Sequence, residues 1–397
     1  MINFEELNKK RILIWGYGRE GQSTKHFLAR HCRDAAVTVF EGKRDEFNED
    51  DYDLIIKSPG IIMEGDDPKF TSQTELFLES FRDKTVGITG TKGKSTTSSL
   101  LFHVLDKCSG KHVVLLGNIG EPCLDYYEEI DDDTIVVFEM SCHQLKHTKV
   151  SPHVAVFLNL YEEHLDYYKT MDKYFEAKSH VTAYQSEEDF FFKGDNVPEI
   201  ATKAKVHVIN YSDPHYFEMK LLGEHNRYNA QFVYDIATSV YGCDPQKVRD
   251  AIAEFTALPH RLQFLGEVDG VRFYDDSIST IPGATIGAVK GIENVGCVLV
   301  GGMDRGINYD ELVKFIRDTE DDGINYIFSY DSGKRIYEEV KDIMNCAYAP
   351  ELKDAVELAK KWAKPGQAVV LSPASASYGY FKNFEQRGDM FKGYAGL

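Results

Sequence analysis

Short apolar runs alternate with segments of helical period along the whole chain. The runs have the length of strands, and the segments between them repeat their apolar residues every three to four positions. The runs that we expect to form strands in the first half are 11–15, 36–41, 53–57, 112–116, 134–139 and 154–159, together with one that carries Val86 and Ile88. Strands that alternate with helices predict an α/β fold with mostly parallel sheets.

The second half begins with an expected hairpin and then continues this alternation. Two apolar runs at about 262–268 and 271–275 flank Asp269-Gly270, which predicts an antiparallel hairpin. The later strands are expected near 295–301, 324–329 and 367–371, and longer helices at about 171–184 and after 223–229. Pattern changes near residue 83 and at Leu258-Pro-His-Arg261 divide the chain into three expected domains, 1–83, 84–258 and 259–397.

The most informative loop is Gly90-Thr-Lys-Gly-Lys-Ser-Thr96, which lies between an expected strand and an expected helix. Glycines at 90 and 93 allow backbone N–H groups to surround an anion, and the helix N-terminus adds partial positive charge. Lys94 can reach the β- and γ-phosphates, and Ser95 can hold Mg²⁺. The match to the general phosphate loop is imperfect, because Ile88 stands where its first glycine belongs. We still expect nucleotide binding rather than a simple turn.

A second glycine loop, Gly16-Tyr-Gly-Arg-Glu-Gly21, precedes a helix that we expect to run to about His31. Glu41 ends the next strand, where a dinucleotide-binding fold places its ribose-binding acid. The loop alone is compatible with NAD(P), with another diphosphate or with a tight turn. Together with the downstream phosphate loop, it favours a chain that binds two phosphorylated ligands.

Three polar residues follow or accompany the strands of the central segment. Glu139 ends an apolar strand, and a carboxylate there commonly holds Mg²⁺; the alternative is a solvated strand end. His164 also follows a strand, and its expected place near the phosphate site makes it a better ligand candidate than an isolated histidine. Lys178 lies in a helical pattern and by itself is an ordinary helix lysine.

Composition limits the possible partners and the compartment. The net charge of −19 disfavours nucleic acid and anionic membranes, and the basic residues form no patch. The first residues do not resemble a signal peptide, and no apolar run approaches the ~18 residues of a membrane span. The 7 cysteines are widely spaced without a C-x-x-C pair, which is typical of reduced thiols in a cytoplasmic protein.

A series of short motifs resembles the Mur ligase family, and within it the members that add glutamate. The motifs follow one another in the family's order from residue 58 to residue 388. They are Ser58-Pro-Gly-Ile61, Gly90-Thr-Lys-Gly-Lys-Ser-Thr96, Gly117-Asn-Ile-Gly120, Glu139-Met-Ser-Cys-His-Gln-Leu145, His164-Leu-Asp166, His225-Asn-Arg-Tyr-Asn229, Leu258-Pro-His-Arg261, Asp276-Ser277, Gly301-Gly302, Leu371-Ser-Pro-Ala-Ser-Ala-Ser377 and Asn383-Phe-Glu-Gln-Arg-Gly388. One such motif is weak, whereas the ordered series is strong.

The resemblance implies three α/β domains: a Rossmann-like domain for the UDP part of a muramoyl substrate, a central P-loop ATPase domain, and a dinucleotide-fold-like domain that brings in the amino acid and closes over the site. The implied ATP-binding residues are Gly90, Thr91, Lys92, Gly93, Lys94, Ser95, Thr96, Asn226, Asn229, Arg261 and Asp276. The implied UDP-substrate residues are Gly16, Tyr17, Gly18, Arg19, Glu41, Ser58, Pro59, Gly60, Asn118, Ser141 and His143. The amino-acid pocket would use Thr280, Arg305, Ser377 and Phe384.

The resemblance also implies the cofactors and the reaction. Two Mg²⁺ ions would be held by Ser95, Glu139, His164 and a carbamylated Lys178. The alanine carboxylate of UDP-N-acetylmuramoyl-L-alanine would attack the γ-phosphate of ATP, and the amino group of glutamate would attack the resulting acyl phosphate. We expect a monomer whose catalytic residues are Lys94, Lys178, His164 and Glu139.

Several positions depart from the usual glutamate-adding pattern. Ile278 replaces the lysine expected to grip a glutamate carboxylate, and Arg305 stands at the cationic place of the Gly-Gly segment. Tyr167 replaces a basic residue after His-x-Asp, and His143 replaces an aromatic residue. These changes gather around the amino-acid pocket and its approaches, so the hand of the glutamate is open, with D-glutamate favoured.

Other classes remain to be separated by experiment. A folylpolyglutamate-type ligase would share the central domain but would differ in its first domain. An NAD(P)-dependent oxidoreductase would use the first glycine loop and leave the phosphate loop unexplained. A non-catalytic nucleotide-binding regulator would not need Lys94, Glu139 and Lys178 together.

Overall fold

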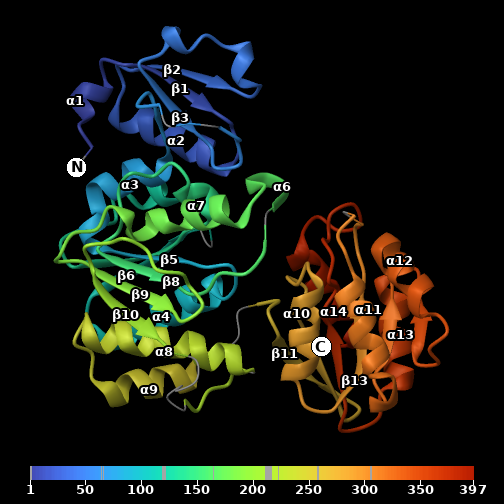
Figure 1. The fold of residues 1–397 in the computed structure, drawn as a ribbon. Coiled ribbons are helices and arrows are strands. Elements are labelled where there is room, and N and C mark those ends of the chain that lie inside the picture. The colour runs from blue at the N-terminus through green and yellow to red at the C-terminus, as the bar shows by residue number, and fades with distance from the viewer. Residues whose placement is uncertain are drawn as a thin grey trace. The chain divides into compact units, whose positions relative to one another are not determined.

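The computed structural model describes residues 2–63, 65, 67–118, 122–163, 165–210, 217–221, 223–256, 259–304 and 306–397. The described chain forms three sheets whose strands are separated by helices (Figure 1). This confirms the expected α/β fold with mostly parallel sheets. Within the described ranges, no helix combines the length and the apolar character that a membrane crossing requires.

The first sheet has the strand order β2-β1-β3-β4, and all its pairings are parallel. Its strands are β1 (Arg11–Trp15), β2 (Ala36–Phe40), β3 (Leu54–Lys57) and β4 (Phe70–Thr71), and its helices are α1 (Phe4–Leu7), α2 (Arg19–His31) and α3 (Gln73–Phe81). The run from Ile12 to Trp15 is buried throughout, as expected for a strand covered on both faces. Its carboxyl end leads directly into the first glycine loop.

The central sheet has six strands in the order β10-β9-β8-β5-β7-β6, and they are parallel. The strands are β5 (Thr85–Thr89), β6 (His112–Gly117), β7 (Thr134–Glu139), β8 (Val154–Phe157), β9 (Phe190–Gly194) and β10 (Lys205–Ile209). The helices are α4 (Lys94–Cys108), α5 (Cys142–Leu145), α6 (Leu165–Tyr168), α7 (Met171–Ala183), α8 (Glu224–Ser239) and α9 (Pro245–Glu254). Because β5 lies between β7 and β8, the loops that follow these three strands meet at one edge.

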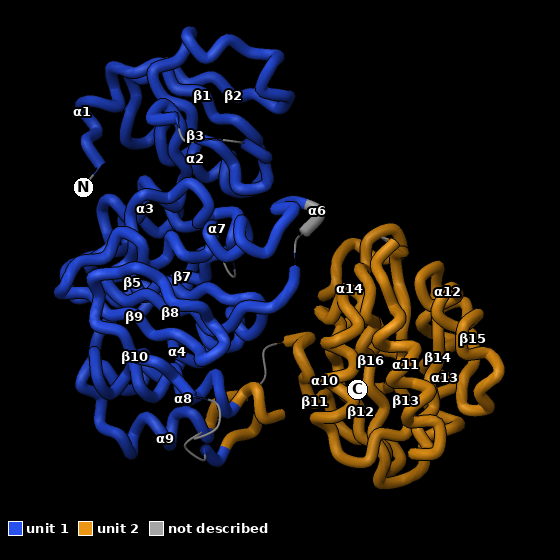
Figure 2. The backbone as a smooth tube through the Cα atoms, viewed as in Figure 1, with its two compact units in different colours: residues 1–218, 227–253 blue, residues 219–226, 254–397 orange. Residues whose placement is uncertain are grey.

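The first two sheets share a hydrophobic core. Ile12 and Phe27 of the first sheet region belong to the same buried cluster as Phe77 of α3 and Phe138 of β7. Contacts accordingly divide the chain into two compact units, Met1–Glu218 with Arg227–Ala253, and Met219–Asn226 with Glu254–Leu397 (Figure 2). The finer division into three domains stays a prediction.

The third sheet belongs to the second unit and has the order β11-β12-β16-β13-β14-β15. Its strands are β11 (Gln263–Val268), β12 (Val271–Asp275), β13 (Val295–Val300), β14 (Asn325–Phe328), β15 (Cys346–Tyr348) and β16 (Ala368–Leu371). Its helices are α10 (Pro282–Gly291), α11 (Asp310–Asp318), α12 (Tyr330–Val340), α13 (Leu352–Trp362) and α14 (Phe384–Ala395). Neighbouring strand residues alternate between two core clusters, so helices cover both faces.

The expected hairpin is confirmed. Strands β11 and β12 pair antiparallel, and Asp269 and Gly270 between them have φ values of +52° and +77°. Two positive φ values are the requirement of a type I′ turn, which explains the Asp-Gly sequence.

Candidate active site

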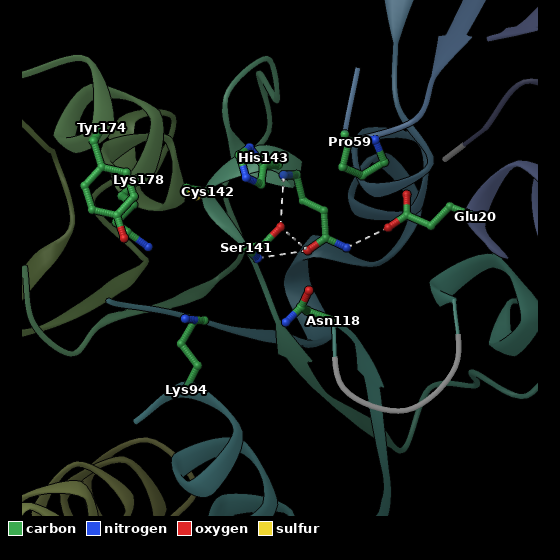
Figure 3. Close-up of a pocket in the computed structure, with 11 residues that line it drawn as sticks. Glu20, Pro59, Lys94, Asn118, Ser141, Cys142, His143, Tyr174 and Lys178 are labelled. Carbon is green, nitrogen blue, oxygen red and sulfur yellow. Dashed lines mark hydrogen bonds between the residues drawn. The ribbon is translucent and has the colours of Figure 1, made fainter. Parts of the chain in front are cut away.

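A cavity of about 330 Å³ lies within the first unit, between the first and central sheet regions. Residues from both regions line it: Glu20, Pro59, Gly60, Lys94, Asn118, Ser141, Cys142, His143, Gln144, Tyr174 and Lys178. In the view of Figure 3, Lys94 and Lys178 lie on one side and Glu20 and Pro59 on the other. The structure therefore brings together residues that are far apart in the sequence.

The phosphate loop has the backbone that its glycines predict. Gly90 has φ +155° and Gly93 has φ +83°, both outside the range that a side chain favours. A Cβ atom on Gly93 would lie 2.7 Å from Oδ1 of Asn229, so this position also lacks space. Asn159 holds the other side of the loop, because its Oδ1 accepts from the Lys92 N–H at 2.9 Å. The loop is thus fixed by neighbours before any anion binds.

Lys94 begins helix α4 and folds back over this loop. Its Nζ donates to the carbonyl oxygens of Gly90 and Thr91 at 2.9 and 3.1 Å. Burial lowers the pKa of Lys94, and the nearby Glu139 opposes that shift. The ammonium group therefore lies at the mouth of the loop, where it can exchange carbonyl partners for phosphate oxygens.

Lys178 is buried rather than an exposed helix lysine, with 1% of its surface accessible. Its Nζ donates to the Gly90 carbonyl at 2.8 Å and lies 4.8 Å from the centre of the Tyr174 ring. Burial, and then the charge of Lys94, lower the pKa of Lys178 to about 7. A large fraction of this amine is therefore neutral near neutral pH.

Glu139 ends β7 at the edge where β5 also ends. Its Oε1 accepts from the Asn118 Nδ2 at 2.7 Å, whereas its Oε2 is buried and has no hydrogen-bond partner among the described residues. A buried carboxylate oxygen with no donor fits a cation. Ser95, in the first turn of α4, is partly exposed.

Across the described ranges, no three His, Cys, Asp or Glu side chains gather as a metal site, and His164 lies outside those ranges. The metal role predicted for His164 is therefore untested.

The first glycine loop is closely packed against the segment that follows β3. Gly16 has φ +94°, and a Cβ atom there would lie 2.8 Å from the Ser58 Cβ. The Ser58 hydroxyl donates to the Gly16 carbonyl at 3.0 Å. A Cβ on Gly21 would meet the Gly16 carbonyl oxygen at 2.1 Å, whereas one on Gly18 would meet nothing within 4 Å. The loop is therefore open to a ligand only around Gly18 and the N-terminus of α2.

The remaining residues predicted for the UDP-substrate lie around this opening or in the cavity. Gly18 caps the N-terminus of α2, Arg19 begins that helix and is exposed, and Tyr17 is partly exposed. Glu41 is exposed and comes directly after β2. Ser141 caps α5, and His143 Nδ1 lies 3.2 Å from the Tyr168 hydroxyl.

A lysine lies beside Tyr167, the residue that replaces the basic side chain expected after the His-x-Asp motif. The Lys146 Nζ lies 5.3 Å from the centre of the Tyr167 ring and donates to the Met63 carbonyl at 3.0 Å. The Tyr167 hydroxyl donates to the Ile61 carbonyl at 3.3 Å. A positive charge is thus present near this position, although it comes from a different element.

In the second unit, Asp276 is almost fully buried among hydroxyl groups. It accepts hydrogen bonds from the hydroxyls of Ser279 and Ser372 and from the Leu262 N–H. Burial raises the pKa of Asp276 to about 6. Asn226 and Arg261, also predicted to bind ATP, belong to this unit, whereas Asn229 belongs to the first.

Arg387, which belongs to the last of the motifs, is buried against Ser277 and Ser375. The Arg387 Nη2 donates to the carbonyls of Ser277 and Ser375 at 2.7 and 3.0 Å, and Ser277 Oγ donates to the Phe384 carbonyl at 2.8 Å. Ser377 is buried two residues beyond Ser375, whereas Thr280 is partly exposed. Arg305 lies outside the described residues, so the structure does not test its place.

Comparisons with known proteins agree with these motifs. Residues 88–216 match the family model described as the Mur ligase middle domain. The chain is 30% identical, over an alignment 451 positions long, to UDP-N-acetylmuramoylalanine--D-glutamate ligase of Streptococcus thermophilus, with 98% of each chain covered. The chain belongs to the Mur ligase family. The resemblance seen in the motifs is thereby confirmed.

Solved structures show how widely this fold is shared. The MurF ligase of Thermotoga maritima in complex with ADP has a TM-score of 0.61 and 18% identity, covering 100% of this chain and 97% of its own. The folylpolyglutamate synthase of Mycobacterium tuberculosis has a TM-score of 0.59 and 13% identity, covering 80% and 94%. At identities this low, the likeness establishes only the fold of this Mur ligase.

Four cavity residues of this Mur ligase were not singled out from the sequence for a role in the site. Glu20, Cys142, Gln144 and Tyr174 all line the cavity. Glu20 occupies a variable position of the first glycine loop, and Gln144 closes the motif that begins at Glu139. Their positions within motifs were the available signal, but only the fold shows that they face the same space.

Proposed function

We propose that this chain is an ATP-dependent ligase that joins glutamate to UDP-N-acetylmuramoyl-L-alanine in peptidoglycan precursor synthesis. The observation that carries the proposal is the end-to-end similarity to an enzyme of that name, with 98% of both chains aligned. The cavity supports it, because the segment around Pro59 and the phosphate-loop lysine Lys94 line the same space. A substrate that reaches from a diphosphate site to the γ-phosphate of ATP needs such a connection.

ATP would be held by the loop from Gly90 to Thr96, with its phosphates on the backbone N–H groups and Lys94. Mg²⁺ would be held by Ser95 and Glu139, with His164 as the further ligand that the motif predicts. A bound Mg²⁺ offsets the negative charge that develops on a transferring phosphoryl group. The free Oε2 of Glu139 supports this site.

Lys178 would act as a carbamate. As an ammonium beside Lys94 it would repel a metal ion, whereas its carbamate is an oxygen donor with negative charge. Only a neutral amine attacks CO₂, and burial of Lys178 favours the neutral form. The N–C bond forms, one proton leaves, and Lys94 remains near enough to balance the new charge.

The reaction then follows from the groups in the cavity. The alanine carboxylate forms a bond to the γ-phosphorus as the bond to ADP breaks, giving an acyl phosphate. The neutral amino group of glutamate attacks the acyl carbon, inorganic phosphate leaves, and the amine loses a proton. Lys94 would stabilise the transferring phosphoryl group, and Asn118 and Ser141 would orient the muramoyl part.

The second unit would carry the amino-acid site. We assign residues 1–83 to the UDP-substrate, 84–258 to ATP and 259–397 to glutamate, with the enzyme acting as a monomer. Ile278 cannot pair with a carboxylate, so Arg305, with Thr280 and Ser377 as hydroxyl donors, would hold the glutamate side chain. D-glutamate is favoured because the relatives' name specifies it.

The test is a phosphate-release assay with UDP-N-acetylmuramoyl-L-alanine, ATP and one amino acid at a time. We expect activity with glutamate, faster with the D form, and a strong decrease in the Arg305→Ala variant. A preference for a diamino acid would reject the glutamate assignment. Activity on folate substrates, or binding of NAD(H) in place of UDP, would support the competing classes.

A further inference from the structure

Glu20 is a half-buried acid at the junction of the two sheet regions, and the reaction described above does not use it. It lies in the first turn of α2, directly beside the open part of the first glycine loop. It lines the cavity together with Gly60 and with Pro59, and Figure 3 shows Glu20 and Pro59 on the same side. Its Oε2 is buried and has no hydrogen-bond partner among the described residues.

A hydrogen-bond network determines which oxygen of Glu20 is available. The Gln144 Oε1 accepts from the Ser141 N–H at 2.8 Å. This contact fixes the orientation of the side-chain amide, so the Gln144 NH₂ group faces Glu20. That group donates to the Glu20 Oε1 at 2.8 Å. Glu20 Oε1 is therefore an acceptor, and a proton on this acid would be carried by Oε2.

Among the described residues, Lys57 is the cation whose charge acts most strongly on this acid, and it forms no ion pair with it. The Lys57 Nζ donates to the carbonyls of Ser58 and Ile61 at 3.1 and 2.9 Å. Burial raises the pKa of Glu20, while Gln144, Lys57 and Arg19 oppose the shift. The titratable groups that face Glu20 or the cavity are Arg19, Lys57, Cys123, Cys142, His143, Tyr174, Lys94 and Lys178.

A bound diphosphate changes this balance further. It places negative charge at the same helix N-terminus, where an ionised Glu20 would repel it. Arg19, exposed at that helix N-terminus, would also pair with the diphosphate and would then favour the ionised acid less. Binding of an anionic substrate therefore favours the protonated acid.

Resting on the proposed function, we propose that Glu20 binds the UDP-substrate as a neutral carboxylic acid, with its Oε2 hydroxyl donating to an oxygen of the substrate. Glu20 is thus a positioning residue that couples substrate binding to proton uptake. Affinity for the UDP-substrate then decreases as pH rises, because the proton must be supplied from solution. The affinity for ATP should not depend on the protonation of Glu20.

The Glu20→Gln variant tests the proposal sharply. Its amide oxygen can still accept from Gln144, and its NH₂ group takes the place of the protonated Oε2 without titrating. We expect wild-type affinity for UDP-N-acetylmuramoyl-L-alanine to fall by up to about tenfold per pH unit above the pKa of Glu20. Glu20→Gln should bind tightly and lose that part of the dependence, whereas Glu20→Ala should bind weakly at every pH.

Calorimetry in buffers of different ionisation enthalpy measures the proton directly, from about pH 6 to about pH 8.5. Near the upper end of this pH range, wild type should take up as much as about one proton for each substrate molecule bound. Glu20→Gln should lack the part of this uptake that comes from Glu20. Glu79→Gln is the matched control, because burial also raises the pKa of Glu79 but it does not line the cavity. UDP alone shows whether the acceptor belongs to the diphosphate or to the sugar part.

Equal proton uptake in wild type and Glu20→Gln would overturn the inference, as would Glu20→Gln binding as weakly as a folded Glu20→Ala. Thermal unfolding of each variant establishes that it is folded. A wild-type protein that binds no UDP-substrate and has no ligase activity would overturn the proposed function as well. Binding and ligation without extra uptake would overturn only the role of Glu20.

Discussion

The two glycine loops of the first unit have similar backbones but differ in the second residue of the helix that follows. Each follows a buried parallel strand and begins a helix whose N-terminus has no side-chain cap. Each contains a glycine at positive φ, Gly16 in one and Gly93 in the other. The first helical position is basic in both, Arg19 and Lys94, whereas the second is Glu20 in one helix and Ser95 in the other.

This difference teaches how one local structure serves two roles. Backbone N–H groups and a helix N-terminus supply an anion site in both loops. A loop that holds a reacting phosphoryl group also needs a cation to offset developing charge, which Lys94 provides. A loop that only anchors a diphosphate has no such need, so its first turn can carry an acid.

Removing the cation is the strongest way to break the comparison. We expect Lys94→Ala to lower ligase activity on the order of 10²- to 10³-fold, because a preorganised charge in the transition state is lost. Affinity for the UDP-substrate should stay close to wild type, since the first loop is intact. Phosphate release and calorimetry measure the two effects. Lys107→Ala, at the far end of α4, is the control.

The two loops would not be independent sites if a folded Lys94→Ala protein lost its affinity for the UDP-substrate.

Lys178 is the next test of the phosphate-loop side. We expect Lys178→Ala to lower activity by about 10²-fold, and removal of CO₂ and bicarbonate to lower wild-type activity reversibly. Lys173→Ala changes an exposed lysine of the same helix and should have no effect. Steady-state rates in degassed buffer, before and after bicarbonate is restored, measure this. A fully active Lys178→Ala enzyme would rule out the carbamate.

Glycine substitutions sharpen the comparison with a smaller effect. Gly16→Ala and Gly93→Ala each force a side chain into positive φ, which costs about 1–2 kcal/mol. We expect a corresponding rise of about 5- to 30-fold in KM for the UDP-substrate in the first variant and for ATP in the second. Gly393→Ala, in a helix with open space around its Cβ, is the control. If either variant raised KM equally for the UDP-substrate and for ATP, the two loops would not each serve a single substrate.

The sequence predicted the parts of this site that depend on local structure. Both strand–loop–helix segments and the Asp269-Gly270 hairpin were expected from period and turn chemistry, and the structure has them. Lys178 shows the limit, because a lysine in a helical pattern gives no sign of burial. Its environment depends on α7 packing against β5 and β8.

The contact between Glu20 and Gln144 shows the same limit over a longer distance. These residues are 124 positions apart and meet only because the first and central sheet regions pack together. Periodicity describes which face of an element is buried, but it does not say which other element covers that face. Strands β9 and β10 also went unrecognised, although the apolar run of β9 ends at Gly194 as a buried strand would.

The strand order of the third sheet has a consequence for how this chain is made. Strand β16 lies in the middle of the sheet, between β12 and β13, yet it is synthesised after every other strand of that sheet. A ribosome that has translated as far as β15 has therefore produced two groups of strands without the one that joins them. Long-range parallel pairing of this kind forms slowly and leaves strand edges exposed meanwhile. Premature termination before Ala368 would thus leave the whole second unit unable to fold, whereas the first unit would already have all its strands.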